Sequence, residues 1–450
     1  MRRAVVLFTR DLRVHDQPAL AAASAAADQV VPLFVFDRAV LKSFGAPNRV
    51  AFLLDCLRDL GGSLRDRGGA LWLREGDVVD AAMRLVQETG AEAIFMSEDV
   101  SAYAQARERR LAAACEGARI ELRTFPGVTV IPPGDLAPEG AECYRVFTPY
   151  WRRWHGAARR SLAPAPRKLV VPGRPTRGRL PALAGLVRGN PSPALPPGGE
   201  SEARARLTRW LARGVARYDE LHDDLAADGT SRLGPYLHFG CLSPLEALER
   251  AHGRDGAEPF LRQLCWRDFY AQLLGARPET AREDFRPRGH RWRTDAAGLQ
   301  AWKEGRTGYP VVDAGMRQLA SEGFLHNRAR LLTASFLTKD LSVDWRAGAA
   351  HFAALLVDGD LASNTGNWQW VAGTGVDTRP NRVFNPVAQA RRFDPAGDYV
   401  RRHVPELAGV PGAAVHEPWK LARRPGGYPE PIVDHREAVA RLQAIREARA

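Results

Sequence analysis

Short apolar segments alternate with amphipathic ones over the first 125 residues of the chain. The apolar segments have the length of buried strands, and those between them repeat apolar residues at helical spacing. We expect strands at 4–8, 30–36, 70–74, 92–96 and 119–125, and helices near 18–27, 47–60, 77–89 and 102–115. Strict alternation of strand and helix predicts a doubly wound, five-stranded parallel sheet with helices on both faces. Such sheets bind ligands at the carboxyl ends of their strands.

The alternating pattern stops near residue 126. Residues 131–200 are rich in Pro, Gly, Arg and Ala, and segments such as NPSPALPPGGE cannot continue a helix or a central strand. From residue 201 onward the spacing is helical, at 203–225, 243–252, 257–274, 296–303, 311–322, 325–338 and 346–356. The sequence therefore predicts an α/β domain at 1–130, a linker at 131–200 and an all-α domain at 201–450.

One segment of the second half, Asp358 to Trp370, has an unusual composition. It reads DGDLASNTGNWQW and combines two carboxylates, two asparagines, two glycines and two tryptophans. An ordinary core helix does not use this composition, because Asp and Asn favour caps and turns. Carboxylates and amides can bind the edge of a heteroaromatic ring, and glycines let the backbone approach it closely. We expect a cleft for a polar aromatic cofactor, and a surface loop with two packed tryptophans is the alternative.

The charge of the chain adds a candidate partner. The formal net charge is +12, and most of the positive charge is arginine. Arginine binds phosphate and stacks on bases better than lysine does, so the composition favours a nucleic acid as partner. A genome of high GC content would also raise the Arg, Ala and Gly content.

The five cysteines and the apolar segments indicate the compartment. The cysteines stand far apart, without metal-ligand spacing, so we expect no metal site and a reducing environment. The apolar run Ala4 to Phe8 is shorter than a signal-peptide core, and no segment approaches the ~18 apolar residues of a membrane span. We expect a cytoplasmic protein.

Two further segments carry candidate binding residues. The run Thr230 to Gly240 places hydroxyls and an arginine before a helix, where free backbone N–H groups can cradle a phosphate. Gln263, Trp266, Arg267 and Tyr270 share one helix face. A polar, cationic and aromatic face suits stacking on an unstacked base, and packing against polar neighbours is the alternative.

A third segment, HNRAR at 326–330, repeats the polar theme. Asn327 and Arg330 lie on one helix face, and Arg330 is a candidate ion-pair partner for Asp358. Trp302 and Trp345 lie in ordinary helical contexts, so by default they belong to the core.

Eight motifs in order resemble the photolyase/cryptochrome family, and most closely the class I bacterial photolyases of cyclobutane pyrimidine dimers (CPDs). They are RDLRVHDQPAL, TSRLGPYLHFGCLSP, LCWRDFY, TGYPVVDAGMRQL, GFLHNRARLLTASFLTKDL, DWRAGAAHF, DGDLASNTGNWQWVAGTG and HEPWK, and they extend over most of the chain. The family fold, an α/β antenna domain joined by a long linker to a helical FAD domain, agrees with the division predicted above.

The resemblance implies one U-shaped FAD in the helical domain. The residues matched to the phosphates and ribityl chain are Tyr218, Thr230, Ser231, Arg232, Leu233 and Gly234. Arg330 would pair with Asp358, Asp360 would contact the flavin ring, and Asn364 would face its N5 atom. Asn364 would thereby tune the protonation and redox state of the flavin.

The resemblance also implies a DNA substrate, single- or double-stranded, with a flipped pyrimidine dimer. The cavity for the dimer would be lined by Gln263, Trp266, Arg267, Asn327, Arg328 and Trp370, and phosphates would bind arginines such as Arg328, Arg379, Arg382 and Arg391. Trp368, Trp345 and Trp302 match the three tryptophans that carry electrons from the surface to oxidised flavin. We expect a monomer that splits the dimer by electron transfer from excited reduced FAD.

Gln263 departs from the pattern, because many CPD enzymes have a glutamate there. The same glutamine occurs in (6-4) photolyases and animal cryptochromes, which keeps a (6-4) photolyase as the alternative. Those enzymes have a second histidine where this chain has Asn327, so the resemblance favours CPD repair. A signalling cryptochrome is the remaining rival, but its long divergent tail is not matched by the about thirty residues after HEPWK.

The antenna pigment is the least specified part of the resemblance. The folate type uses a glutamate that the stretch Ser101 to Gln105 lacks. The segment FDRAVLKSFGAPNRVAFLLDCL resembles the 8-hydroxy-5-deazaflavin type, with Arg49 and Asp99 as contacts. FMN, folate or an empty antenna site stay open as alternatives.

Overall fold

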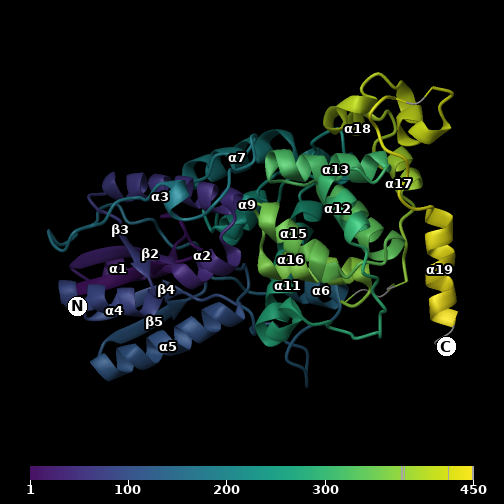
Figure 1. Ribbon diagram of the computed structural model, residues 1–450. Coiled ribbons are helices and arrows are strands. Elements are labelled where there is room, and N and C mark those ends of the chain that lie inside the picture. Colours follow the sequence, from purple (N-terminus) through teal and green to yellow (C-terminus); the bar gives the residue numbers. More distant parts are fainter. Residues whose placement is uncertain (377–378, 380, 424, 448–450) are drawn as a thin grey trace.

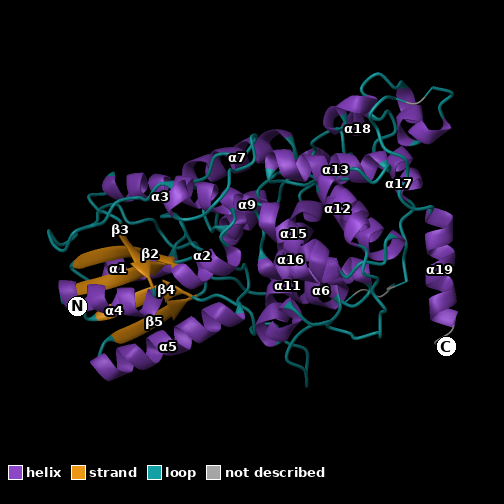
Figure 2. Ribbon diagram, in the orientation of Figure 1, coloured by secondary structure: helices purple, strands orange, loops and turns teal. Residues whose placement is uncertain are grey.

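The computed structural model describes residues 1–376, 379, 381–423 and 425–447, and an α/β part is joined to a helical part (Figures 1 and 2). The strands are β1 (Arg3–Phe8), β2 (Gln29–Asp37), β3 (Trp72–Gly76), β4 (Ala93–Ser97) and β5 (Glu121–Phe125). The helices among them are α1 (Pro18–Ala26), α2 (Arg38–Phe44), α3 (Pro47–Arg65), α4 (Val78–Thr89) and α5 (Ala102–Ala118). The predicted alternation is confirmed, although α2, which has no buried residue, was not predicted.

The five strands form one parallel sheet in the order β3-β2-β1-β4-β5. In the central strand β1, Val5 is paired with Val31 of β2 and with Ile94 of β4. Chain connections run in opposite directions on the two sides of β1, so the switch point of this topology lies between β1 and β4. The residues that follow these two strands, from Thr9 and from Glu98 onward, therefore meet at one edge of the sheet.

Alternate residues of β1 belong to two different cores. Val5 and Leu7 pack with apolar residues of α4 and α5, whereas Val6 and Phe8 pack with α1 and α3. All four side chains are at most 1% exposed. A parallel strand that is buried on both faces reads as a continuous apolar run, which is why AVVLF was identifiable in the sequence.

The linker contains α6 (Phe147–Gly156), and helices make up the rest of the chain. They are α7 (Glu200–Arg213), α8 (Tyr218–Leu221), α9 (Gly234–His238), α10 (Pro244–Ala251), α11 (Glu258–Ala276), α12 (Ala296–Glu304), α13 (Pro310–Glu322), α14 (Asn327–Ser335), α15 (Trp345–Leu355), α16 (Leu361–Ala372), α17 (Pro386–Phe393), α18 (Asp398–His403) and α19 (His435–Glu447). None of the described helices has the length and apolar character that a membrane crossing requires.

Two predicted helices are interrupted in the structure. The segment 203–225 divides into α7 and α8, because Gly214 has low helix propensity and ends α7. The segment 325–338 continues beyond α14 as a short π-helix, Phe336–Asp340, so the expected single helix changes its hydrogen-bond pattern near its end.

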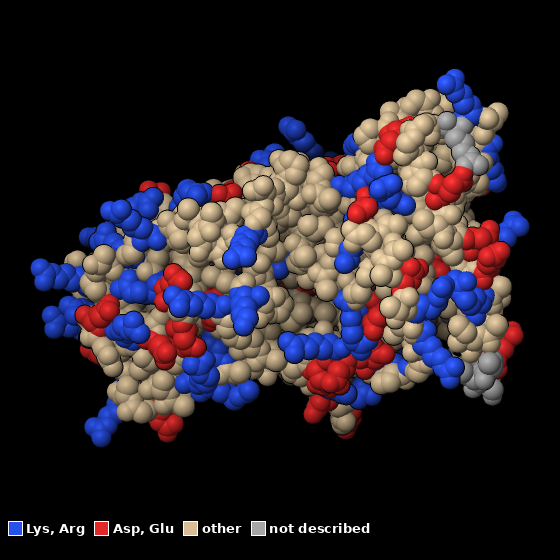
Figure 3. Space-filling view, viewed as in Figure 1, with Lys and Arg blue, Asp and Glu red and all other residues tan. Residues whose placement is uncertain are grey.

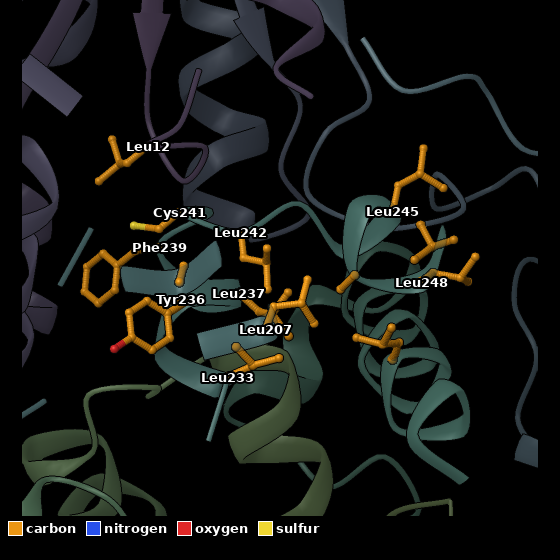
Figure 4. Close-up of a cluster of buried hydrophobic side chains, with 14 of the residues drawn as sticks. Leu12, Leu207, Leu233, Tyr236, Leu237, Phe239, Cys241, Leu242, Leu245 and Leu248 are labelled. Atoms are coloured by element: carbon orange, nitrogen blue, oxygen red, sulfur yellow. The ribbon is translucent and has the colours of Figure 1, made fainter. Parts of the chain in front are cut away.

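The core on the α1 and α3 side of the sheet continues into the helical domain. The ring of Phe52 in α3 lies 5.3 Å from that of Tyr236 in α9 and 5.2 Å from that of Phe239. Figure 4 shows Leu12, from the loop after β1, beside Phe239 and Cys241. The two domains are therefore joined by a shared apolar core as well as by the linker.

Candidate functional site

The turn Asp358–Asp360 and helix α16 occupy the segment that the sequence singled out. Residues 361–372 form a helix, which the sequence did not predict. The Asp360 carboxylate accepts a hydrogen bond from the Ser363 N–H at 2.8 Å and caps the helix. Lys339 donates to the Ala372 carbonyl at the other end, at 2.7 Å. An anion at the first turn and a cation at the last both complement the helix dipole, and packing against α11, α14 and α15 overrides weak propensity.

Each carboxylate of the turn has an arginine partner. Arg330 donates from Nη2 to both oxygens of Asp358, at 3.0 and 2.9 Å, so the expected ion pair is present. Arg10 donates to Asp360 at 2.5 Å. Burial alone would raise the pKa of Asp360, but the Arg10 charge and the approach of His238 hold this pKa well below its ordinary value. Asp360 can therefore remain ionised inside the protein.

The hydroxyl-rich run at 230–234 lies beside the same turn. A Cβ at Gly234 would lie only 2.4 Å from an Asp358 oxygen, so the start of α9 and the turn are in direct contact. The Thr230 hydroxyl is buried without a hydrogen-bond partner among the described residues. Leu233 and Tyr218 are buried nearby in the same apolar core.

A cavity of about 220 Å³ lies next to this run. Its lining includes Arg206, Asp228, Arg232, Glu322 and Phe324. Because ligand pockets usually measure roughly 300–1,000 Å³, the cavity can accept one end of an extended cofactor. The sequence predicted that Arg232 binds a phosphate of the cofactor. In the structure its guanidinium is instead paired with Asp228 at 2.6 Å and with Glu322 at 2.9 Å.

These features fit a flavin dinucleotide. The unpartnered Thr230 hydroxyl, and the Ser231 hydroxyl beside it, can bind phosphate oxygens. Asn364 is half-buried on α16 although this helix packs on three others, which indicates open space beside it. Its amide donates to the Ala349 carbonyl of α15 at 3.1 Å and is thereby fixed in orientation.

The aromatic residues expected to bind a lesion lie on two packed helices, α11 and α16. Trp266 is half-buried and stacks on Phe147 of α6 with ring centroids 3.7 Å apart. Gln263 is exposed one turn earlier on the same helix. Trp370 is half-buried, with the Arg382 guanidinium 5.4 Å from its ring centre.

Two of the expected lesion contacts have partners inside the protein. Arg267 donates to the carbonyls of Val128 and Leu237, at 2.5 and 3.3 Å, and so connects the linker to α9. Arg328 is paired with Asp223 and lies 4.2 Å from the Phe393 ring centre. Both guanidinium groups make internal contacts, because a partly buried cation needs a partner, and their contact with a lesion stays a prediction. Asn327 is exposed at the start of α14.

Tryptophans expected to conduct electrons are brought together only in part. The rings of Trp302 and Trp368 lie 6.1 Å apart, and both contact Phe352. Trp345 donates from its indole N–H to Asp284 at 2.9 Å. All three are at most 2% exposed, so Trp302 cannot be the surface end of a chain.

Trp292 is a candidate that the sequence reasoning missed. It is half-buried, and the next residue, Arg293, donates from its backbone N–H to the Ser342 carbonyl at 2.8 Å. Its segment therefore runs beside the residues that precede Trp345. The signal in the sequence was a tryptophan in a polar stretch, because HRWR, which follows Gly289, is not apolar enough for a core element.

The two expected antenna contacts are also used internally. Arg49 donates to the backbone carbonyls of Phe44, Ala353 and Leu356, and burial lowers its pKa to about 10. Asp99 is paired with Arg10 at 3.2 Å. The hydrogen bonds of Arg49 to Ala353 and Leu356 join the two domains, and a role of Arg49 in pigment binding stays a prediction.

On the face that Figure 3 shows, positive side chains do not form a single uninterrupted patch. Figure 3 shows Lys and Arg side chains distributed over one face with Asp and Glu among them. Arg391, one of the expected phosphate ligands, is paired with Glu417. Among the described residues, no group of three His, Cys, Asp or Glu side chains is placed to hold a metal ion.

Comparisons with known proteins agree over the whole chain. Residues 4–169 match a family model described as DNA photolyase, and residues 260–448 match one described as the FAD binding domain of DNA photolyase. A deoxyribodipyrimidine photo-lyase of Streptomyces griseus is 53% identical over 454 residues, covering 99% of both chains.

Two solved structures share the fold. A bacterial class III photolyase from Agrobacterium tumefaciens is 33% identical with a TM-score of 0.92, over 100% of this chain and 98% of that one. An archaeal photolyase from Sulfolobus tokodaii, solved with two FAD molecules, is 32% identical with a TM-score of 0.89, over 99% and 100%. Site geometry, family models and full-length relatives lead to one conclusion, that this chain belongs to the DNA photolyase family.

Proposed function

We propose that this protein binds one FAD against the Asp358–Asp360 turn and repairs cyclobutane pyrimidine dimers in DNA under light. The observation that carries the proposal is the position of this turn. It joins the unpartnered Thr230 hydroxyl and Gly234 on one side to the aromatic helices α11 and α16 on the other. A relative named deoxyribodipyrimidine photo-lyase that is 53% identical over its whole length supports the substrate.

The residues of the chain supply binding, orientation and exclusion of water. When bound and reduced, FAD would supply on excitation by light one electron, which would pass to the dimer and return after the ring splits, and no side chain need exchange a proton with the substrate. Asn364 is fixed by its hydrogen bond to the Ala349 carbonyl and would offer its remaining amide oxygen to a flavin bound beside α16. Trp266, which stacks on Phe147, and Trp370 give two aromatic surfaces on which a flipped dimer can stack.

Gln263 is the residue on which the choice of lesion depends. It is exposed one turn before Trp266, where its amide can accept from a pyrimidine imide N–H and donate to a carbonyl. Asn327, also exposed, is a poor proton donor, and this favours CPD repair over repair of (6-4) products, which needs a proton transfer.

The test compares two lesions in light and in darkness. An oligo(dT) carrying CPDs and an oligonucleotide carrying a (6-4) product are incubated separately with the flavin-loaded protein. We expect light-dependent loss of CPDs only. Light-dependent loss of the (6-4) product would make the protein a (6-4) photolyase, and no loss of either lesion by the flavin-loaded protein would overturn the proposed activity.

Two exposed helical glutamines provide a matched pair of variants. Gln263 lies on α11 and Gln87 on α4, in the other domain. We expect Gln263→Ala to weaken binding of CPD-containing DNA about tenfold, because hydrogen bonds to the lesion are lost without replacement. Gln87→Ala should bind CPD-containing DNA as tightly as the unmodified protein does. Equal affinities of the two variants for this DNA would show that Gln263 does not contact the lesion.

For photoreduction of oxidised flavin, we propose that Trp368, Trp345 and the half-buried Trp292 form the route to the surface. Trp302, which is buried and 6.1 Å from Trp368, would be a side branch. Trp292→Phe should slow photoreduction more than Trp302→Phe does. The reverse order would restore Trp302 as the terminal residue.

For the antenna, we propose a tricyclic pigment, 8-hydroxy-5-deazaflavin or a flavin, at the carboxyl ends of the strands. The stretch Ser101 to Gln105 lacks the glutamate of the folate type, and the Sulfolobus relative was solved with a second FAD. Extraction of the protein from a host that makes deazaflavin, followed by mass spectrometry, identifies the pigment. Recovery of folate would contradict this assignment.

A further inference from the structure

Arg10 lies in the loop after β1, at the switch point of the sheet, and reaches into the helical domain. Each nitrogen of its guanidinium donates to a different element. Nε donates to the His238 carbonyl of α9 at 3.2 Å, Nη1 to Asp99 after β4 at 3.2 Å, and Nη2 to Asp360 before α16 at 2.5 Å. A planar guanidinium can satisfy three such acceptors at once, which an ammonium group cannot do in the same geometry.

The backbone that carries Arg10 is fixed against the helical domain. Gly240 has a φ of +66°, and a Cβ there would lie 2.0 Å from the Arg10 carbonyl oxygen. Leu12 donates from its backbone N–H to the Phe239 carbonyl at 3.2 Å, and Figure 4 shows these residues side by side. Arg13 donates to the Gly240 carbonyl at 2.9 Å. These contacts hold the backbone at Arg10 in a fixed position relative to the helical domain.

Asp360 connects Arg10 to the flavin side of α16. One carboxylate oxygen of Asp360 accepts a hydrogen bond from the Ser363 N–H and so caps α16. The backbone carbonyl of Asp360 accepts from the Asn364 N–H at 2.8 Å. The other carboxylate oxygen binds Arg10. A change in the position or charge of Asp360 would therefore shift the first turn of α16, where Asn364 lies.

The remaining charged groups around Asp360 do not replace Arg10. His238 approaches Asp360 with Nδ1 at 3.9 Å, and burial lowers the pKa of His238, so this ring is neutral at pH 7. Arg267 is near enough to favour the Asp360 anion, but its guanidinium is bound to the Val128 and Leu237 carbonyls. Arg10 is the direct cationic partner of Asp360.

We propose that Arg10 is a positioning residue of the cofactor site, through which the α/β domain fixes the ionised Asp360 and hence the start of α16. The proposal rests on the FAD site proposed above. It assigns the α/β domain a second role besides holding an antenna pigment, because the charge that stabilises Asp360 comes from that domain. Asp99 orients Arg10 from the sheet and thereby joins the switch point to the turn.

The test uses the full-length protein loaded with FAD and four variants. They are Arg10→Gln, Arg10→Lys, Asp360→Asn and the double variant Arg10→Gln/Asp360→Asn. We expect Arg10→Gln to weaken FAD binding at least about tenfold, because a buried carboxylate loses its partner. The FAD affinity of Arg10→Lys should lie between those of Arg10→Gln and the unmodified protein, because lysine keeps the positive charge but not the planar geometry of the guanidinium. The double variant should match Asp360→Asn alone, because Arg10 acts through Asp360.

A dependence on pH separates positioning from a general structural role. Without Arg10 the pKa of Asp360 rises, so Asp360 takes up a proton as pH falls. FAD retention and the flavin absorption spectrum of Arg10→Gln should therefore change between pH 8 and pH 5. The unmodified protein and the double variant should show no such titration. A pH-independent Arg10→Gln variant, or a double variant weaker than both single ones, would overturn the proposal.

Two controls complete the design. Arg38→Gln removes an exposed arginine paired with Glu75 in the same domain, and it should leave FAD binding unchanged. Asp99→Asn removes the carboxylate that orients Arg10 from the sheet, and it tests the same contacts if Arg10→Gln does not fold. We expect this variant to bind FAD more weakly than the unmodified protein. Unchanged FAD binding would contradict the proposed role of Arg10. If the unmodified protein itself binds no FAD, the proposed function fails; if it binds FAD and the variants do too, only the role of Arg10 fails.

Discussion

The centre of the parallel sheet is fully buried and the Asp358–Asp360 turn is partly buried, and the two regions are stabilised in different ways. Val5, Val6 and Leu7 are fully buried among apolar neighbours, so local sequence suffices to place them. In the turn, Asp358 depends on Arg330, and Asp360 depends on Arg10, which is 350 residues away. Apolar burial sets the fold, whereas the site requires specific partners from separate elements.

The largest expected effect on stability is in the sheet. Phe95 of β4 is fully buried and stacks on Phe125 with ring centroids 5.8 Å apart. Phe95→Ala should lower the free energy of unfolding by about 3–5 kcal/mol, because a cavity replaces the ring. Urea titration measures this loss. Each remaining folded molecule should bind FAD normally, and Val170→Ala, at an exposed position, should change stability by less than about 0.5 kcal/mol.

The opposite result is expected in the turn. Arg330→Met leaves the Asp358 carboxylate without its cation and should remove most bound FAD, with a loss of stability of only about 1–3 kcal/mol. FAD content per folded protein and urea titration are measured together. Arg123→Met, which breaks an exposed pair with Glu121, should change neither. If Arg330→Met unfolds the protein but the folded fraction retains FAD, the two regions do not differ as described.

Packing between α11 and α16 provides a third comparison. A Cβ at Gly366 would lie 2.2 Å from a ring carbon of Tyr270, so Gly366→Ala should cost about 1–3 kcal/mol by overpacking. Gly117 in α5 is exposed and has no atom within 4 Å of a Cβ, so Gly117→Ala should stabilise by up to about 1 kcal/mol. Thermal unfolding of both variants checks the signs. A stabilising Gly366→Ala would contradict the close contact.

Of the substitutions considered, His351→Phe in α15 should have the smallest effect on the free energy of unfolding at neutral pH. Burial lowers the pKa of His351 to about 4, and its Nε2 has no hydrogen-bond partner within the described part of the chain. His351 takes up a proton near pH 6.5 in the unfolded chain but only near pH 4 in the folded protein. The free energy of unfolding therefore falls as the pH decreases from about 6.5 to about 4. His351→Phe should flatten that fall and change little at pH 7. Urea titrations at pH 4.5 and 7 measure the difference, and an equal pH dependence in both proteins would contradict it.

The sequence predicted the sheet and most helices because each follows from a local apolar period. It missed α16 as a helix, since the stabilising contacts of Asp360 and Lys339 come from packing rather than from propensity. The pairing of Arg330 with Asp358 could be predicted, but the use of Arg49 and Arg10 at the domain interface could not. Their partners Asp360 and Leu356 lie more than 300 residues away along the chain, and no local pattern reports them.

The central claim, that the arginine-paired turn and its surroundings hold FAD, is tested most directly by the flavin content of the purified full-length protein. Protein incubated with FAD and freed of excess cofactor is denatured, and the released flavin is measured by absorption. We expect about one FAD per chain at the site, with a further equivalent only if the antenna site also takes a flavin. Folded protein that retains no FAD would contradict the claim.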